Sequence, residues 1–250
     1  MRGKDAKRLP QAQPKHAMVL AAGLGTRMRP ITDNTPKPLV RVGGRALIDH
    51  ALDRLREARV DSAVVNVHHL ADRIVEHVGT RRQPSVVISD ERDKLLETGG
   101  GVVKALPLLG DTPFYLMNSD SFWIEGPRSN LRSLAEAWND EEMDALLMLA
   151  PTVAAIGYEG KGDFFMDANG RLTPRPETDV APFVYTGVAI VDPRAMFADA
   201  PKGSFSLNVL IDRVSESGRL FGIRMDGTWF HVGTPSAIDE AERILVGTAA

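Results

Sequence analysis

The chain has 250 residues, of which 43% are hydrophobic and 25% charged, a composition typical of a folded globular protein. It contains no cysteine, which excludes disulfides, thiolate nucleophiles and cysteine-based zinc sites and agrees with our expectation of a cytoplasmic protein. No apolar stretch reaches the length of about 20 residues that a membrane-spanning helix needs, so we expect no membrane partner.

Positive charge is concentrated at the N-terminus, where residues 1–16 carry five Lys or Arg and one Asp, although the net charge of the chain is −3. This segment lacks the apolar core of a signal peptide, so we expect residues 1–16 to form a flexible basic tail and residues 17–250 a single domain. The domain is mildly acidic and has no basic stripe. It therefore argues against a nucleic-acid partner and leaves a small anionic substrate open.

Short apolar runs alternate with amphipathic segments of helical length from residue 17 onwards. We predict strands at 17–21, 62–67, 85–89 and 114–118, helices at 46–58 and 70–78, and a Gly-rich turn at 98–101 that opens a helix to residue 109. This order implies an α/β fold with a Rossmann-like, mostly parallel sheet flanked by helices. Ligands are then expected at the carboxyl ends of the strands.

The second half of the chain has a different texture. After a predicted helix at 129–138 and a strand at 144–150, glycines at 157, 160, 162 and 170 punctuate short strands. We interpret this segment as a small antiparallel insertion that caps the sheet. A strand at 183–191 and helices at 206–218 and 235–246 complete the predicted elements.

The densest motif covers residues 20–38 and follows the first predicted strand. Gly23 and Gly25 allow backbone N–H groups to approach an anion, as phosphate-binding loops require. Arg27 stands near the place where a dinucleotide-binding motif has its third glycine, and no Gly-Lys-Ser/Thr closes a P-loop. The sequence therefore supports neither hydride transfer nor P-loop hydrolysis.

This motif resembles the signature of the sugar-1-phosphate nucleotidyltransferases, Gly-x-Gly-x-Arg-x-x-Pro-x-Thr followed by Pro-Lys-Pro. The resemblance extends from residue 17 to about 246, and its fixed positions are Gly23, Gly25, Arg27, Pro30, Thr32, Pro36, Lys37 and Pro38. It implies a transferase that joins a nucleoside triphosphate to a sugar 1-phosphate and releases pyrophosphate.

Positioned cations are the main requirement of such a transfer, because the attacking phosphate is already anionic and needs no general base. The resemblance assigns the triphosphate and the leaving pyrophosphate to Arg27, and the transferring phosphate to Lys37. The alternative for each is a solvated loop cation. The nucleotide-binding residues that it implies are Ala21, Ala22, Gly23, Gly25, Thr26, Arg27 and Asn118.

Asp120, at the end of a predicted strand, is the expected Mg²⁺ ligand and the third catalytic residue. The family usually has Gly before this Asp, where this chain has Ser119. The family's second metal-binding carboxylate is the Asp of a Trp-x-Asp-x-Gly-Thr motif. In this chain His231 stands at that position. An imidazole suits Mn²⁺ better than Mg²⁺. Three alternatives stay open: His231 binds the metal, Asp120 carries it together with the phosphates, or His231 only forms a local hydrogen bond.

The remaining site residues are implied on the sugar side. Leu96-Glu-Thr-Gly-Gly-Gly101 and the Gly-Asp-Phe at 162–164 resemble the short N-acetylmuramate-1-phosphate uridylyltransferases of cell-wall peptidoglycan recycling, which make a UDP-sugar. Each candidate also has an alternative without ligand binding. Residues 96–101 could form a helix N-cap, residues 162–164 a turn, and Arg175, a further candidate, could be an ordinary surface arginine. The implied sugar or phosphate ligands are Glu97, Thr98, Gly99, Asp163, Arg175, Thr186 and Gly187.

We therefore expect a metal-dependent enzyme whose substrates are UTP and N-acetylmuramate 1-phosphate and whose cofactor is Mg²⁺ or Mn²⁺. Three alternatives remain: a mannose-1-phosphate guanylyltransferase, a non-catalytic homologue that binds a sugar nucleotide, and a nicotinamide oxidoreductase. Members of the family commonly form homo-oligomers, and no unmatched apolar face indicates one here.

Overall fold

A computed structural model describes residues 13–248 of the chain, and residues 1–12, most of the predicted basic tail, lie outside the described residues. The first strand, β1 (His16–Leu20), starts one residue earlier than predicted. The backbone N–H of Asp61 also donates to the carbonyl of Lys15 at 2.8 Å. Lys15 and His16, at the end of the predicted tail, therefore belong to the folded part. The single domain over 17–250 stays a prediction.

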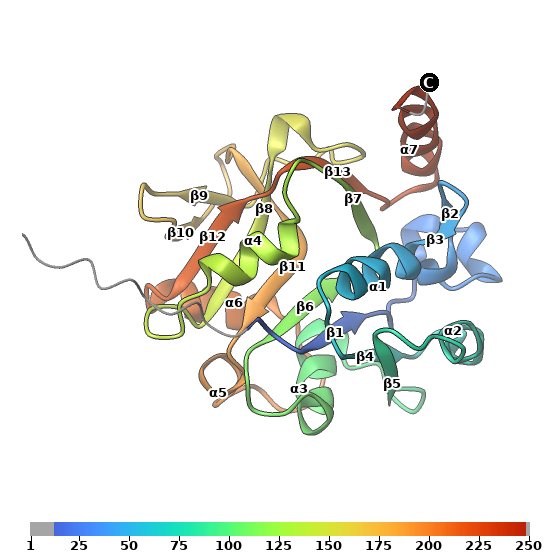
Figure 1. Ribbon diagram of the computed structural model, residues 1–250, viewed down its shortest axis with the longest axis horizontal. Helices are drawn as coiled ribbons and strands as arrows, with labels where there is room; N and C mark the ends of the chain where they lie inside the picture. Colours follow the sequence, from blue (N-terminus) through green and yellow to red (C-terminus); the bar gives the residue numbers. More distant parts are fainter. Residues whose placement is uncertain (1–12, 249–250) are drawn as a thin grey trace, which may run out of the picture.

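A nine-stranded sheet forms the centre of the fold, in the order β10-β9-β11-β6-β1-β4-β5, with β8 paired to β11 and β12 to β8 (Figure 1). β6, β1, β4 and β5 are parallel neighbours, whereas β11 runs antiparallel to β6, β8 and β9. The α/β class with a parallel core is confirmed, but the sheet as a whole is mixed rather than mostly parallel because β11 reverses direction. Its other strands are β4 (Ser62–Val67), β5 (Ser85–Asp90), β6 (Phe114–Asn118), β8 (Ala145–Pro151), β9 (Phe164–Met166), β10 (Leu172–Pro174), β11 (Phe183–Val191) and β12 (Leu220–Arg224).

Helices cover both faces of the sheet, and each face has its own apolar core. α1 (Leu47–Glu57), α2 (Ala71–Val78) and α4 (Asn130–Ala137) pack on one face through residues such as Leu52 and Ile74. α3 (Glu97–Leu109), α5 (Pro193–Met196) and α6 (Asn208–Glu216) pack on the other. The period-3.6 apolar patterns that predicted α1 and α2 thus mark their buried stripes.

The predicted Gly-rich turn at 98–101 is not a turn: α3 already begins at Glu97, and the three glycines lie in its first turns. A side chain at each position would collide with a neighbour. A Cβ would lie 2.3 Å from the Phe205 ring at Gly99, 2.2 Å from the Gly203 carbonyl oxygen at Gly100, and 2.8 Å from Asn66 at Gly101. The glycines therefore allow the chain before α6 and the end of β4 to pack directly on α3.

Two small ribbons were not predicted from the sequence. β7 (Ser121–Glu125) pairs antiparallel with β13 (Gly227–His231), and β2 (Arg41–Val42) pairs with β3 (Arg45–Ala46). Both are close to a third apolar cluster, on which α7 (Pro235–Thr248) packs at the edge of the molecule (Figure 1). The predicted antiparallel insertion consists of β9 and β10, which extend the edge of the sheet beyond β11 rather than capping it.

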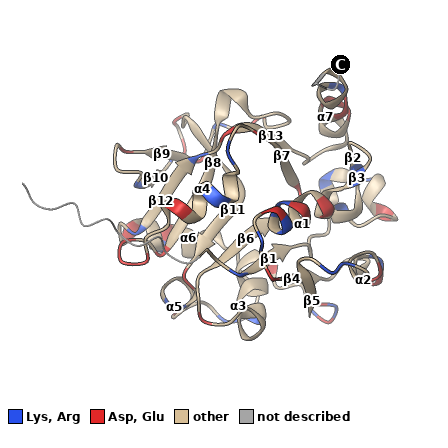
Figure 2. Cartoon of the chain, in the orientation of Figure 1, with Lys and Arg blue, Asp and Glu red and all other residues tan. Residues whose placement is uncertain are grey.

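Most charged residues lie on the helices and loops around this framework, although a few such as Glu91 are buried. Figure 2 shows Lys and Arg interspersed with Asp and Glu over the helices and loops, while the central strands are largely free of both. Within residues 13–248 we find no helix with the length and apolarity needed to cross a membrane.

Candidate active site

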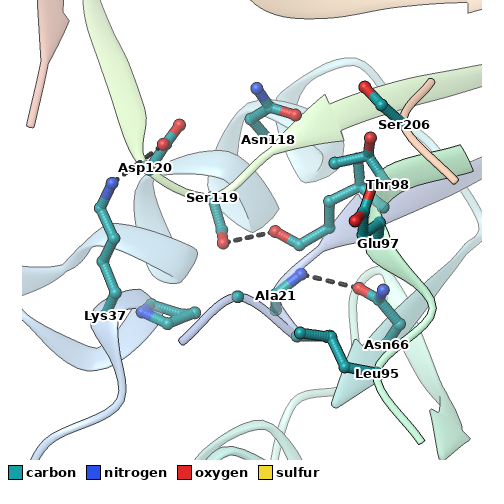
Figure 3. A pocket seen from close by; sticks show the side chains of 14 residues that line it. Ala21, Lys37, Asn66, Leu95, Glu97, Thr98, Asn118, Ser119, Asp120 and Ser206 are labelled. Atoms are coloured by element: carbon teal, nitrogen blue, oxygen red, sulfur yellow. Dashed lines mark hydrogen bonds and ion pairs between the residues drawn. The ribbon is translucent and has the colours of Figure 1, made fainter. Parts of the chain in front are cut away.

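A cavity of about 410 Å³ opens at the carboxyl ends of the parallel strands, where ligands of open α/β sheets bind. One wall is the loop after β1, and the opposite wall is the turn that leads into α3 (Figure 3). The end of β6 forms the floor between them. The side chains and backbone that line it belong to Leu20, Ala21, Ala22, Gly23, Lys37, Pro38, Asn66, Leu95, Glu97, Thr98, Asn118, Ser119, Asp120 and Ser206.

Lys37 and Asp120 form an ion pair at one end of this cavity, with 2.9 Å between Nζ and Oδ2 (Figure 3). Lys37 is held in a short 3-10 helix between Pro36 and Pro38, which restrict its backbone. Burial would raise the pKa of Asp120, but the electrostatic interactions with Lys37, His231 and Arg27 and the hydrogen bond from Lys37 together lower it below its usual value. The carboxylate is thus held ionised beside the Lys37 ammonium group, and no residue among 13–248 donates a hydrogen bond to its second oxygen, Oδ1.

His231 reaches Asp120 through the ribbon of β7 and β13. His231 is paired with Ser121, and the N–H of the next residue, Val232, donates to the Asp120 carbonyl at 3.0 Å. Burial lowers the pKa of the His231 imidazole, and the charge of Lys37 also lowers it, while Asp120 opposes both. A neutral imidazole is the form that can bind a metal. Gly233 leaves room for the ring, since a Cβ at that position would lie 2.6 Å from its Nε2.

Arg27 lies on the other side of this group, in a short 3-10 helix (Thr26–Met28). It does not line the first cavity but a second one of about 350 Å³, together with His231, Tyr158 and Thr234. Its positive charge acts on both Asp120 and His231. Arg27, Lys37, Asp120 and His231 therefore meet where the two cavities approach each other.

The loop after β1 that contains Gly23 and Gly25 divides into two parts. Ala21, Ala22 and Gly23 line the first cavity, whereas Gly25 and Thr26 do not. Gly25 has a φ of 64°, and a Cβ there would lie 2.9 Å from Thr32 Cγ2 and 3.2 Å from Lys37 Cβ. Its place in the motif is explained by close packing that sets the position of Lys37.

The end of β6 and the bend in β11 fit closely together. Asn118 lines the cavity, and a Cβ on Gly187, whose φ is 80°, would lie 2.6 Å from its Nδ2. The buried Thr186 hydroxyl donates to the Met148 carbonyl at 2.8 Å. Ser119, the residue that departs from the family pattern, donates from Oγ to the Leu20 carbonyl at 2.6 Å and so ties β6 to β1.

The α3 wall carries Glu97 and Thr98 at the cavity, while Gly99 is packed behind them. Thr98 Oγ1 accepts a hydrogen bond from the Leu207 N–H at 2.8 Å, so it also holds the chain before α6. That chain brings Ser206 to the cavity, a residue that no sequence signal indicated.

Asp163 and Arg175 lie outside the first cavity, in the segment around β9 and β10. Asp163 accepts from the Tyr185 N–H at 2.8 Å, and burial raises its pKa although Tyr185 and Arg175 oppose the shift. The Arg175 guanidinium donates to the backbone carbonyl of Gly162 and to three carbonyls of the loop that follows Arg175, at 2.8 to 3.0 Å. In the structure Arg175 thus braces a loop.

The donor set suits a metal that is held mainly by phosphates. Within residues 13–248, no three Asp, Glu or His side chains converge into a closed metal site. Asp120 offers one carboxylate and His231 one imidazole at the same place. Mg²⁺ is commonly bound by one or two carboxylates and substrate phosphates, so these residues fit such an ion.

Two buried residues near the cavity were missed from the sequence. Asn66 and Glu91 are 2% and 0% exposed, and they lie at the ends of β4 and β5. The signal was available for Asn66, because it is a polar residue inside an otherwise apolar strand, Ser62–Val67.

Comparison with known proteins shows the family to which the chain belongs. The family model described as Nucleotidyl transferase matches residues 16–246. The chain is 49% identical over 236 residues to the N-acetylmuramate alpha-1-phosphate uridylyltransferase of Caulobacter vibrioides, covering 93% of this chain and 97% of that protein. The protein of the same name from Neisseria meningitidis serogroup B is 34% identical, with 91% and 97% coverage.

Among solved structures, a UDP-glucose pyrophosphorylase complexed with UDP-glucose has the same fold, with a TM-score of 0.73 at 15% identity and coverage of 94% of this chain and 99% of that one. The inositol-1-phosphate CTP transferase from T. maritima has a TM-score of 0.70 at 18% identity, with 95% and 98% coverage. With a family model that spans nearly the whole described chain and a relative at 49% identity, this protein belongs to the nucleotidyl transferase family.

Proposed function

We propose that the protein is a uridylyltransferase that joins UTP to N-acetylmuramate 1-phosphate. A phosphate oxygen of the sugar phosphate attacks the α-phosphorus of UTP and forms a new P–O bond. The bond between the α-phosphorus and the oxygen that bridges to the β-phosphorus breaks, and pyrophosphate leaves with that electron pair. The products are the UDP-sugar and pyrophosphate, and no general base is needed because the attacking oxygen is anionic.

The reaction class rests on one observation: the cations Lys37 and Arg27 and the carboxylate Asp120, which could bind a metal, lie close together between the first cavity and the second. The choice of substrates is supported by two relatives whose names state this activity and which align over at least 91% of this chain. UTP as a substrate fits a cytoplasmic enzyme of peptidoglycan recycling.

We assign the nucleoside to the first cavity, between the Ala21–Gly23 backbone and the start of α3, with the Asn118 side chain at the floor. Glu97 and Thr98, which the resemblance implied as sugar or phosphate ligands, would then lie beside the nucleoside. Lys37 would bind the α-phosphate, whose negative charge increases in the transition state. Arg27, beside the second cavity, would hold the β- and γ-phosphates until pyrophosphate departs.

Members of this family typically use Mg²⁺. Asp120 would hold the ion on its free carboxylate oxygen, and His231 is the adjacent second ligand. When bound, the ion neutralises charge on the triphosphate oxygens. Lys37 stays paired with the other oxygen of Asp120 and keeps the carboxylate oriented.

On the sugar side we propose that Asp163 and the Thr186–Gly187 bend face the sugar phosphate. Arg175 contributes there chiefly through its loop, because its guanidinium already donates to four backbone carbonyls.

The test is pyrophosphate release by the purified protein with Mg²⁺ or Mn²⁺, N-acetylmuramate 1-phosphate and each nucleoside triphosphate in separate reactions. We expect release with UTP alone. Release only with GTP and mannose 1-phosphate would overturn the proposed substrates, and tight nucleotide binding without turnover across a panel of sugar 1-phosphates would overturn the enzyme.

A further inference from the structure

A continuous chain of buried hydrogen bonds connects the two walls of the nucleotide cavity from behind. The Ala21 N–H donates to Asn66 Oδ1 at 2.7 Å (Figure 3). Asn66 Nδ2 donates to Glu91 Oε1 at 2.7 Å, and the Leu96 N–H donates to Glu91 Oε2 at 3.1 Å. Ala21 belongs to the loop after β1, and Leu96 immediately precedes α3, so the chain runs from one wall to the other.

The order of the strands produces this chain. β1, β4 and β5 are consecutive parallel neighbours, and their carboxyl ends carry Ala21, Asn66 and Glu91 respectively. Glu91 is fully buried and has no Lys or Arg partner among the described ion pairs. A buried carboxylate without a counter-ion is costly and is tolerated where hydrogen-bond donors satisfy it.

The directions of the backbone donors at the two ends of this chain of hydrogen bonds require a carboxylate at Glu91. Ala21 and Leu96 are backbone donors and cannot reverse, so the Asn66 amide must present its oxygen to Ala21 and its nitrogen to Glu91. Both groups that approach Glu91 are then donors. Only an acceptor at both oxygens, an ionised carboxylate, completes the chain.

Gly101 leaves the space that this chain occupies. A Cβ at that position would lie 2.8 Å from both Asn66 Nδ2 and Glu91 Oε1, the two atoms of the central hydrogen bond. Gly101 has no positive φ and lies inside α3, where Ala is normally favoured over Gly. The glycine is thus explained by the hydrogen bond and not by the helix.

We infer that Asn66 and Glu91 are positioning residues for the nucleotide. They fix the width of the slot between Ala21–Gly23 and Leu95–Thr98, and through that width the affinity for UTP and the discrimination against larger bases. The inference rests on the proposed function for the identity of the nucleotide. Asn66 contributes to the lining of the cavity, and Glu91 acts through it and through Leu96.

Variants that exchange the amide and the carboxylate between positions 66 and 91 provide the test. In Glu91→Gln the new amide nitrogen must face a donor, at either Asn66 or Leu96. In Asn66→Asp two carboxylates face each other. In the double variant Asn66→Asp with Glu91→Gln, Asp accepts from both Ala21 and Gln, and the Gln oxygen accepts from Leu96. All three hydrogen bonds can form again.

We expect each single variant to raise the dissociation constant of UTP about tenfold or more, as for the loss of a buried charged hydrogen bond, with a turnover number within about threefold of wild type. The affinity ratio of UTP to GTP should fall. The double variant should recover most of the UTP affinity, and Gly101→Ala should resemble the single variants. Glu76→Gln, an exposed change of the same type, is the control.

Nucleotide affinity is measured by calorimetric titration without the sugar phosphate, alongside the Tm and both KM values. This titration needs no turnover, so it tests the positioning role of Asn66 and Glu91 separately from the proposed function. A wild-type protein that is inactive with N-acetylmuramate 1-phosphate would contradict the proposed function alone. If the wild type binds a different triphosphate, the same titrations are run with that one. Unchanged affinity in folded single variants, or no recovery in the folded double variant, would overturn the positioning role.

Discussion

The two regions to which we assign the nucleotide and the sugar, here called the nucleotide side and the sugar side, are built in different ways. On the nucleotide side, the walls come from the ends of parallel strands, and buried side chains such as Asn66 and Ser119 tie one strand end to the next. On the sugar side, β9 and β10 are only three residues long each. There, Asp163 accepts from the backbone N–H of Tyr185 in β11, and Arg175 donates to backbone carbonyls of adjacent loops.

This contrast suggests a division of tasks. The strand-end framework is rigid because each tie is buried and joins elements of the same sheet, which suits the chemical step shared by the family. The loops on the sugar side can change without disturbing that framework. If so, substitutions on the two sides should affect different measured quantities.

The largest effect should come from Lys37→Ala at the point where the two sides meet. Removal of a fixed cation that stabilises charge in the transition state should lower kcat about 10²–10³-fold. UTP binding should weaken far less, because the cavity walls stay in place. Pyrophosphate release and a UTP titration measure the two effects, and Lys202→Ala, an exposed lysine far along the chain, should behave as wild type. An equal loss of binding and turnover would contradict this.

A smaller effect is expected for Gly99→Ala, which tests the packing behind the α3 wall. The new Cβ would lie 2.3 Å from the Phe205 ring, and such overpacking costs about 1–3 kcal/mol in the free energy of unfolding. Chemical denaturation measures it. Gly247→Ala is the matched control, because nothing lies within 4 Å of a Cβ there. Adding Phe205→Ala should relieve the strain of Gly99→Ala, and a second loss of similar size would argue against direct collision.

Arg175→Ala should act on the sugar side alone. Loss of the guanidinium donors to the carbonyls of its loop should raise the KM for the sugar phosphate and lower the free energy of unfolding by about 1 kcal/mol. The KM for UTP should not change. Steady-state kinetics with each substrate varied in turn distinguish this from a direct phosphate ligand, for which kcat would fall without a change in stability.

The smallest effect is expected for His231→Asp, which restores the family's carboxylate. Activity should be retained, and the ratio of rates with Mg²⁺ and Mn²⁺ should shift a few-fold toward Mg²⁺, the harder ion with the stronger preference for oxygen. Rates at saturating concentrations of each metal provide the comparison. A folded but inactive variant would show that the imidazole has another task.

The sequence predicted the nucleotide side better than the sugar side, and the reason is physical. β1, β4 and β6 are mainly apolar runs whose ends must lie at one sheet edge, so Ala21 and Asp120 could be placed together, and the family resemblance added Lys37. The β7–β13 ribbon joins segments far apart along the chain, and no local pattern reports such pairing. The glycines of α3 were predicted as a turn, because the Phe205 ring that packs on Gly99 comes from a distant segment.

The β7–β13 ribbon also has a consequence for the order of events on the ribosome. β13 ends at His231, so its pairing with Ser121 cannot form until the chain has been made as far as residue 231. The parallel strands β1, β4, β5 and β6, at whose ends the first cavity opens, are all complete by residue 118. A nascent chain can therefore assemble the parallel core first, and the corner that holds Asp120 and His231 closes later.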